Sequence, residues 1–202
     1  QRVISAVVLL AIFIPILLIG KLPYAILMTI ISWIGLYEIL KARTKKKEFP
    51  LIMKILAYLL VTFFVITNYQ AESIFLDRFL FYIDYRVMAL LIFAYVVPIV
   101  FINNNKKYNL NDALFLIGST LFIGVSFSLL ISIRHLDLNY IIYLFLIAII
   151  TDTFALLTGR KIGKNKLAPD ISPNKTWEGF IGGTLMGTFV ATMYYISVFN
   201  NP

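Results

Sequence analysis

The chain has 202 residues, of which 60% are hydrophobic and 14% are charged, and its mean hydropathy is +0.88. Soluble domains are about 45–50% apolar and about 25% charged, so this composition excludes an ordinary soluble domain and indicates an all-α polytopic membrane bundle. The absence of cysteine excludes disulfides and thiolate metal sites. The net charge of +8 comes from basic residues between apolar runs, so it does not indicate a nucleic-acid partner.

Seven apolar runs are long enough to be read as membrane spans, because a span needs about 20 residues and shorter or tilted spans are tolerated. Polar segments marked by Gly, Pro or Asn separate the runs. We predict one integral membrane domain over residues 1–202, which we expect to be part of a longer protein. The predicted spans are 3–19, 22–40, 51–67, 87–102, 110–133, 138–158 and 177–199.

The basic residues are distributed unevenly between alternate ends of these spans. Only Lys21, Arg78, Arg86 and Arg134 lie at one set of ends, and the other 14 of the 18 lysines and arginines lie at the opposite set. Because such an excess marks the cytoplasmic side, the pattern predicts a cytoplasmic amino terminus. The loop 159–176 then also lies in the cytoplasm, where nucleotide triphosphates are found.

A compact polar cluster directly precedes the last apolar run. It contains Ser172, Pro173, Lys175 and Thr176, and the apolar run begins at Trp177. A helix start offers free backbone N–H groups and a partial positive charge, so this cluster predicts a phosphate site at the membrane surface. Further basic residues in the same loop are Arg160, Lys161, Lys164 and Lys166.

Two simpler interpretations of this cluster remain open. Pro173 could form a turn while Thr176 caps the following helix, which would make the segment an ordinary helix start. The basic residues could hold anionic lipid headgroups.

Asp152 is an acidic residue inside the sixth apolar run, where a charge is costly and usually faces the bundle interior or water. At helical spacing it shares a stripe with the small residues Ala148, Ala155 and Gly159. The seventh run carries a matching stripe of small residues, namely Gly179, Gly183 and Gly187.

If these two stripes meet, Asp152 comes near Lys175 and Glu178, and a carboxylate beside a phosphate site is how Mg²⁺ is usually held. The alternative is that Asp152 pairs with a basic loop residue and fixes the register of the helices.

The segment 166–183, KLAPDISPNKTWEGFIGG, closely resembles the conserved segment of phosphatidate cytidylyltransferases, also called CDP-diacylglycerol synthases. The resemblance extends to Asp152-Thr153 and Gly159-Arg160, and more weakly to residues 2–6. It implies transfer of a cytidylyl group from CTP to phosphatidic acid with Mg²⁺, in phospholipid biosynthesis at the cell membrane.

The resemblance also implies functional residues. The family's phosphate-binding positions fall on Ser172, Pro173, Lys175 and Thr176, and its membrane-embedded acid falls on Asp152. We predict that Asp152 and Lys175 are catalytic and that Asp152 binds the metal. From their place in this sequence we add Glu178 as a second metal or outer carboxylate, and Lys166 and Arg160 as further phosphate-binding residues.

The chain departs from the family pattern in two places. Phe154, Ala155 and Leu156 follow Asp152-Thr153, where family members often have a small residue, an alanine and an aromatic residue. The acidic, Gly- and His-containing signature near the family's carboxyl end is also absent, so residues 1–202 alone are expected to be inactive. The rival hypothesis is a transporter or lipid-binding protein whose buried acid binds an ion. The sequence leaves open whether the protein forms a homodimer.

Overall fold

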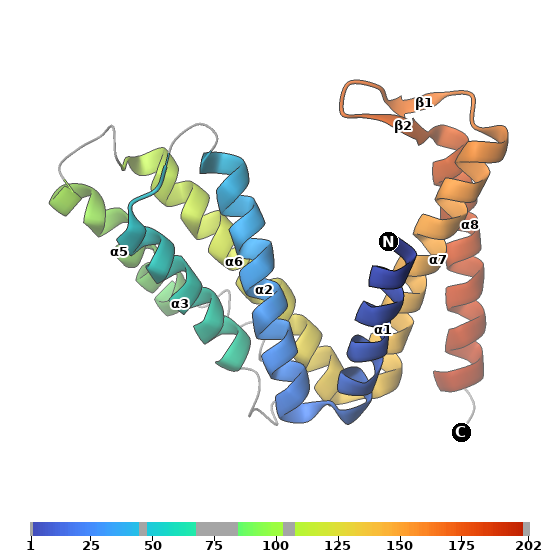
Figure 1. The fold of residues 1–202 in the computed structure, drawn as a ribbon, viewed down its shortest axis with the longest axis horizontal. Helices are drawn as coiled ribbons and strands as arrows, with labels where there is room; N and C mark the ends of the chain where they lie inside the picture. Colours follow the sequence, from blue (N-terminus) through green and yellow to red (C-terminus); the bar gives the residue numbers. More distant parts are fainter. Residues whose placement is uncertain (1, 45–47, 68–84, 103–107, 200–202) are drawn as a thin grey trace. The chain divides into compact units, whose positions relative to one another are not determined.

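The computed structural model describes residues 2–44, 48–67, 85–102 and 108–199 (Figure 1). Some of the basic residues that contribute to the predicted charge asymmetry lie outside the described residues, among them Lys45, Lys46, Lys47, Lys106 and Lys107. The chain divides into two compact units, Gln1–Leu136 and Asp137–Pro202, and each unit is described by itself.

In the first unit, the described residues form five helices, with α6 at the centre of their packing. Helices α2, α3 and α5 pack against α6, while α1 packs against α2 (Figure 1). Met28, Leu36, Val61, Phe64 and Leu116 are fully buried between these helices and form part of the apolar core. The five helices are α1 (Arg2–Ile19), α2 (Lys21–Thr44), α3 (Leu51–Thr67), α5 (Tyr85–Ile102) and α6 (Leu110–Leu136).

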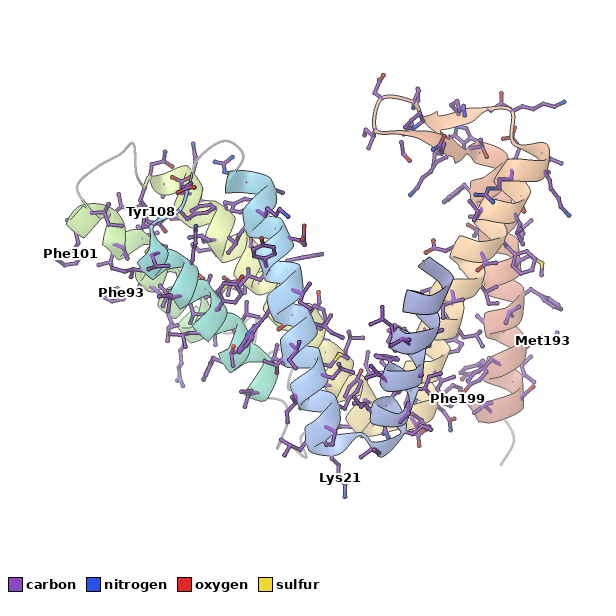
Figure 2. All side chains as sticks on the ribbon, viewed as in Figure 1. Lys21, Phe93, Phe101, Tyr108, Met193 and Phe199 are labelled. Carbon is purple, nitrogen blue, oxygen red and sulfur yellow. The ribbon has the colours of Figure 1, made fainter. Side chains whose placement is uncertain are left out.

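Buried polar groups connect the helices of this unit through hydrogen bonds. The hydroxyl of Tyr108, whose side chain is labelled in Figure 2, donates to the Tyr95 carbonyl oxygen at 2.8 Å. The Tyr95 hydroxyl lies 2.6 Å from the Thr120 hydroxyl. Burial raises the pKa of Tyr108 well above its ordinary value, so this side chain stays a neutral donor. At the other end of α6, the Arg134 guanidinium donates to the carbonyl oxygens of Leu17 and Leu18. These bonds satisfy backbone carbonyls that the end of α1 leaves open.

The second unit is a pair of long helices with a small two-stranded sheet at one end (Figure 1). Asp137 caps the start of α7, because its side chain accepts a hydrogen bond from the Asn139 backbone N–H at 2.6 Å. Gly163 ends α7. The elements are α7 (Leu138–Ile162), β1 (Lys166–Ala168), β2 (Ser172–Thr176), α8 (Trp177–Tyr194) and a turn of π-helix, η1 (Tyr195–Phe199).

Small residues hold α7 and α8 close together. Gly179, Gly183, Gly187 and Ala191 recur every fourth residue on α8, and all four are buried. A methyl group at Gly183 would lie 2.6 Å from the Thr151 carbonyl oxygen and 2.8 Å from the Ala155 Cβ atom. The glycine stripe of α8 therefore packs closely against α7, at Thr151, Ala155 and Gly159.

Each predicted apolar run forms a helix, and the all-α membrane fold is confirmed. Four helices in the described chain are long and apolar enough to cross a membrane: Lys21–Arg43, Leu110–Leu136, Leu138–Ile162 and Trp177–Phe199. The shorter apolar helices are Val8–Ile19, Leu51–Ile66 and Arg86–Ile102. The composition and these helices make the chain a membrane protein, while the number of seven spans stays a prediction.

Candidate functional site

The segment between α7 and α8 forms an antiparallel β-hairpin, which the sequence did not predict. The Ile171 backbone N–H donates to the Ala168 carbonyl oxygen at 3.2 Å and closes the turn. Lys166 lies opposite Thr176, and Ala168 lies opposite Ser172. An advance of two residues along β1 therefore corresponds to an advance of four residues along β2. The strands therefore contain a bulge.

The base of this hairpin is fixed by Glu178, in the first turn of α8. Its carboxylate accepts hydrogen bonds from the backbone N–H groups of Lys164, at 3.1 Å, and Asn165, at 3.2 and 3.3 Å. The Asn165 side-chain amide donates a further bond at 2.8 Å. In return, the Trp177 backbone N–H donates to the Asn165 carbonyl oxygen at 3.0 Å. The two ends of the hairpin are thereby tied to each other.

Thr176 caps α8, as the simpler interpretation of the sequence predicted. Its hydroxyl oxygen accepts a hydrogen bond from the Gly179 backbone N–H at 3.2 Å, and the residue is buried. A Cβ atom at Gly159 would lie 3.0 Å from this hydroxyl, and one at Gly163 would lie 2.6 Å from it. The hydroxyl therefore lies within the contact between the helices, and the structure does not present it to a phosphate at the surface.

Local partners occupy part of the start of α8. The backbone N–H groups of Trp177 and Gly179 donate to Asn165 and Thr176. A phosphate at this end would therefore rely on side chains as well as on the other donors of the helix start, and the phosphate site itself stays a prediction.

The other residues predicted to bind phosphate gather at the hairpin end and are accessible. Pro173 and Lys175 on β2, Lys166 on β1 and Arg160 in the last turn of α7 are exposed, while Ser172 is half-buried. The structure thus brings three cations and one hydroxyl-bearing residue to one end of the helix pair. An arginine and two lysines in a small region form a suitable surface for phosphate oxygens.

Asp152 is exposed and lies farther along α7. It precedes the end of α7 at Ile162 by ten residues, which corresponds to roughly 15 Å of helix. Glu178 is bonded to Lys164 and Asn165, just beyond that end. Glu178 thus has partners of its own near the end of α7, and the Mg²⁺ site predicted for Asp152 and Glu178 together stays a prediction.

The described residues do not fit a complete metal site. Among them, no three His, Cys, Asp or Glu side chains are grouped so that they could hold a metal ion. The missed functional candidate is Asn165, which contacts Glu178 across thirteen positions of sequence. No local sequence pattern signals that contact.

Comparison with known proteins gives a consistent result. Residues 1–202 match the sequence model of the Cytidylyltransferase family. The chain is 30% identical to a phosphatidate cytidylyltransferase of Bacillus subtilis, over 97% of this chain and 71% of that protein. It is 32% identical to the phosphatidate cytidylyltransferase of Staphylococcus aureus (strain COL), over 96% of this chain and 72% of that protein. No solved structure shows a significant match.

Proposed function

This chain belongs to the cytidylyltransferase family, and on that premise we propose that it transfers a cytidylyl group from CTP to phosphatidic acid. The products are CDP-diacylglycerol, an intermediate for phospholipid biosynthesis, and pyrophosphate. The observation that carries the proposal is the cationic hairpin, which lies at the end of two helices long and apolar enough to span a membrane.

In this reaction a phosphate oxygen of phosphatidic acid attacks the α-phosphorus of CTP, and pyrophosphate leaves in line. Both reactants are anions, so their approach depends on positioning and on neutralisation of negative charge. We assign Lys175 to the phosphate oxygens at the reacting centre, with Lys166 and Arg160 binding other phosphate oxygens. The exposure of these three side chains supports the assignment, because each can reach a ligand at the membrane surface.

Ser172 and Pro173 have a related role in the proposal. The Ser172 hydroxyl donates a hydrogen bond to a phosphate oxygen. Pro173 restricts the preceding residue to an extended backbone, which agrees with the position of Ser172 at the start of β2. The ring thereby reduces the conformational freedom that Ser172 would lose when a substrate binds.

The proposed protein crosses the membrane several times, with the amino terminus and the hairpin in the cytoplasm. The uneven distribution of basic residues supports this orientation. The hairpin then faces the compartment that supplies CTP, while the lipid tails of phosphatidic acid remain between the spans.

We also propose Mg²⁺ as a cofactor, with Asp152 as one of its carboxylate ligands. When bound, Mg²⁺ would neutralise the charge of the phosphate oxygens. The position of Asp152 inside a candidate span supports a functional role, because an acidic side chain at that depth is costly. One carboxylate does not complete a magnesium site, so no step of the reaction is assigned to the metal here.

The test is incorporation of radiolabelled CTP into lipid by the purified protein in detergent micelles containing phosphatidic acid. Lys175→Ala should lower turnover by roughly two orders of magnitude, as removal of one preorganised donor does in other enzymes. Lys54→Ala, in α3 of the other unit, is the matched control and should be nearly neutral. Equal losses in both variants would mean that lysines act only through general surface charge. Ion-driven solute uptake without lipid labelling would instead support a transporter.

A further inference from the structure

We infer that Glu178 is a positioning residue that holds the cationic hairpin in place through Asn165, and that it is not a metal ligand. This inference rests on the proposed function, because its consequence is the placement of Lys166 and Lys175 for cytidylyl transfer. It also replaces the metal-binding role that the sequence suggested for Glu178.

The carboxylate is already engaged by the protein. It accepts bonds from two consecutive backbone N–H groups and from the Asn165 side-chain amide, with donor–acceptor distances of 2.8 to 3.3 Å. Bonds to an ionised carboxylate are stronger than bonds between neutral groups. A metal ion would have to displace some of these donors, and the backbone N–H groups of Lys164 and Asn165 would then lose their acceptor.

The bonds act at the base of the hairpin, where they control its direction. Asn165 immediately precedes Lys166, and Trp177 follows Thr176 directly, so the Asn165–Glu178 and Asn165–Trp177 bonds close the segment between them. The bulge between the strands leaves fewer regular pairings to define the hairpin by itself. Its orientation relative to the helix pair therefore depends on this closure.

If the bonds at the base of the hairpin are lost, we expect kcat to fall more than the affinity for substrate. Lys166 and Lys175 would keep their charges and their attraction for phosphate, but their positions would vary. Misplacement by about 1 Å can cost on the order of 100-fold in rate, even when the cause is remote from the reacting atoms.

In the Asn165–Glu178 pair one side chain is an amide that donates and the other is a carboxylate that accepts. Exchanging the amide and the carboxylate between the two positions therefore tests the bond directly. Glu178→Gln keeps one oxygen for the backbone N–H groups but removes the negative charge, and the Asn165 amide must turn over so that its oxygen accepts from the new NH₂ group. Asn165→Asp alone places two carboxylates against each other. When both changes are combined, the amide at position 178 donates to the carboxylate at position 165. The remaining amide oxygen at position 178 accepts from the backbone.

The experiment compares the full protein with the two single variants and the double variant. Four quantities are measured: kcat for cytidylyl transfer, KM for CTP, the dependence of activity on Mg²⁺ concentration, and hydrogen exchange of the Lys164 and Asn165 backbone amides. We expect each single change to lower kcat by about 10-fold to 100-fold. Both should speed amide exchange and leave the Mg²⁺ dependence unchanged, and the double variant should recover most of the loss.

Two results would overturn the inference. One is a higher Mg²⁺ requirement for Glu178→Gln that Asn165→Asp does not reverse, because the carboxylate would then act on the metal. The other is unchanged amide exchange in Glu178→Gln, because the bonds would then not close the hairpin. Size-exclusion chromatography identifies single variants that fail to fold. In that case, hydrogen exchange of the Lys164 and Asn165 amides in the double variant still tests whether the Asn165–Glu178 pair closes the hairpin. Because residues 1–202 alone are expected to be inactive, all variants are made in the full-length protein, and an inactive full-length wild type would count against the proposed function alone.

Discussion

The contact between α7 and α8 predicts a strong effect of a single methyl group at Gly183. In Gly183→Ala the new Cβ atom would lie 2.6 Å from the Thr151 carbonyl oxygen, 2.8 Å from the Ala155 Cβ and 3.1 Å from the Ala155 Cα. Ordinary contacts between such atoms are about 3.5–4.0 Å, so the helices must separate by roughly 1 Å or distort. Two of the three atoms belong to the backbone of α7 and cannot rotate away.

Overpacking of this kind typically costs about 1–3 kcal/mol. Alanine also has a higher helix propensity than glycine, by about 1 kcal/mol. Gly118→Ala in α6 isolates this second effect, because a Cβ atom there meets nothing within 4 Å. We therefore expect Gly118→Ala to be neutral or stabilising and Gly183→Ala to unfold at a lower temperature. A shift of about 2–4 °C per kcal/mol is typical for a chain of this size.

The assay is thermal unfolding of the purified protein in detergent, with loss of monodisperse protein after heating as a second measure. Adding Ala155→Gly to Gly183→Ala should restore part of the stability, because it removes the 2.8 Å contact but leaves the carbonyl contact. Equal stability of Gly183→Ala and Gly118→Ala would refute the close packing of α7 and α8.

Two further predictions concern the hairpin end of the second unit. Thr176→Val should lower the free energy of unfolding by about 1 kcal/mol because it removes the cap on α8, whereas Thr176→Ser should keep the cap. An increase in KM for CTP without loss of stability would contradict the capping role of Thr176. The chain has no cysteine, so a single cysteine at Asp170 should be labelled only from the cytoplasmic side and one at Leu136 only from the other side, while labelling of both positions from one side would refute the proposed orientation.

The helices could be predicted because each is a long apolar run with polar residues at its ends. The contact of Gly179, Gly183 and Gly187 with α7 could also be predicted, since glycines at intervals of four residues form a smooth stripe on a helix. These features depend on local periodicity, which a single sequence displays directly.

The hairpin could not be predicted in the same way. Its strands are three and five residues long, and β2 includes a proline, so they lack the alternation typical of longer strands. The hairpin is stabilised at its base by Asn165 and Glu178, which are far apart in sequence. Other local bonds, which the sequence did not reveal either, occupy the Trp177 and Gly179 donors at the start of α8, while the predicted phosphate site stays a prediction.

Aromatic residues relate the hairpin to the membrane surface. The exposed Trp177 packs edge-to-face with Phe180 at the first turn of α8. Phe199, labelled in Figure 2 near the far end of the helix pair, stacks on Tyr140. From Trp177 to Tyr194, α8 spans roughly 26 Å, which is close to the thickness of a hydrocarbon core of about 30 Å.

Tryptophan and tyrosine favour the two interfaces of a bilayer, so we expect Trp177 to lie at the level where α8 leaves the hydrocarbon. Lys175 precedes it by two residues, so in the proposed orientation it would lie among the headgroups. A lipid phosphate and a nucleotide from solution can meet at that level without either one leaving its own phase. In the proposed function, the bonds at the base of the hairpin hold its cationic side chains in place before phosphatidic acid and CTP bind. These side chains then need not be positioned during the reaction itself.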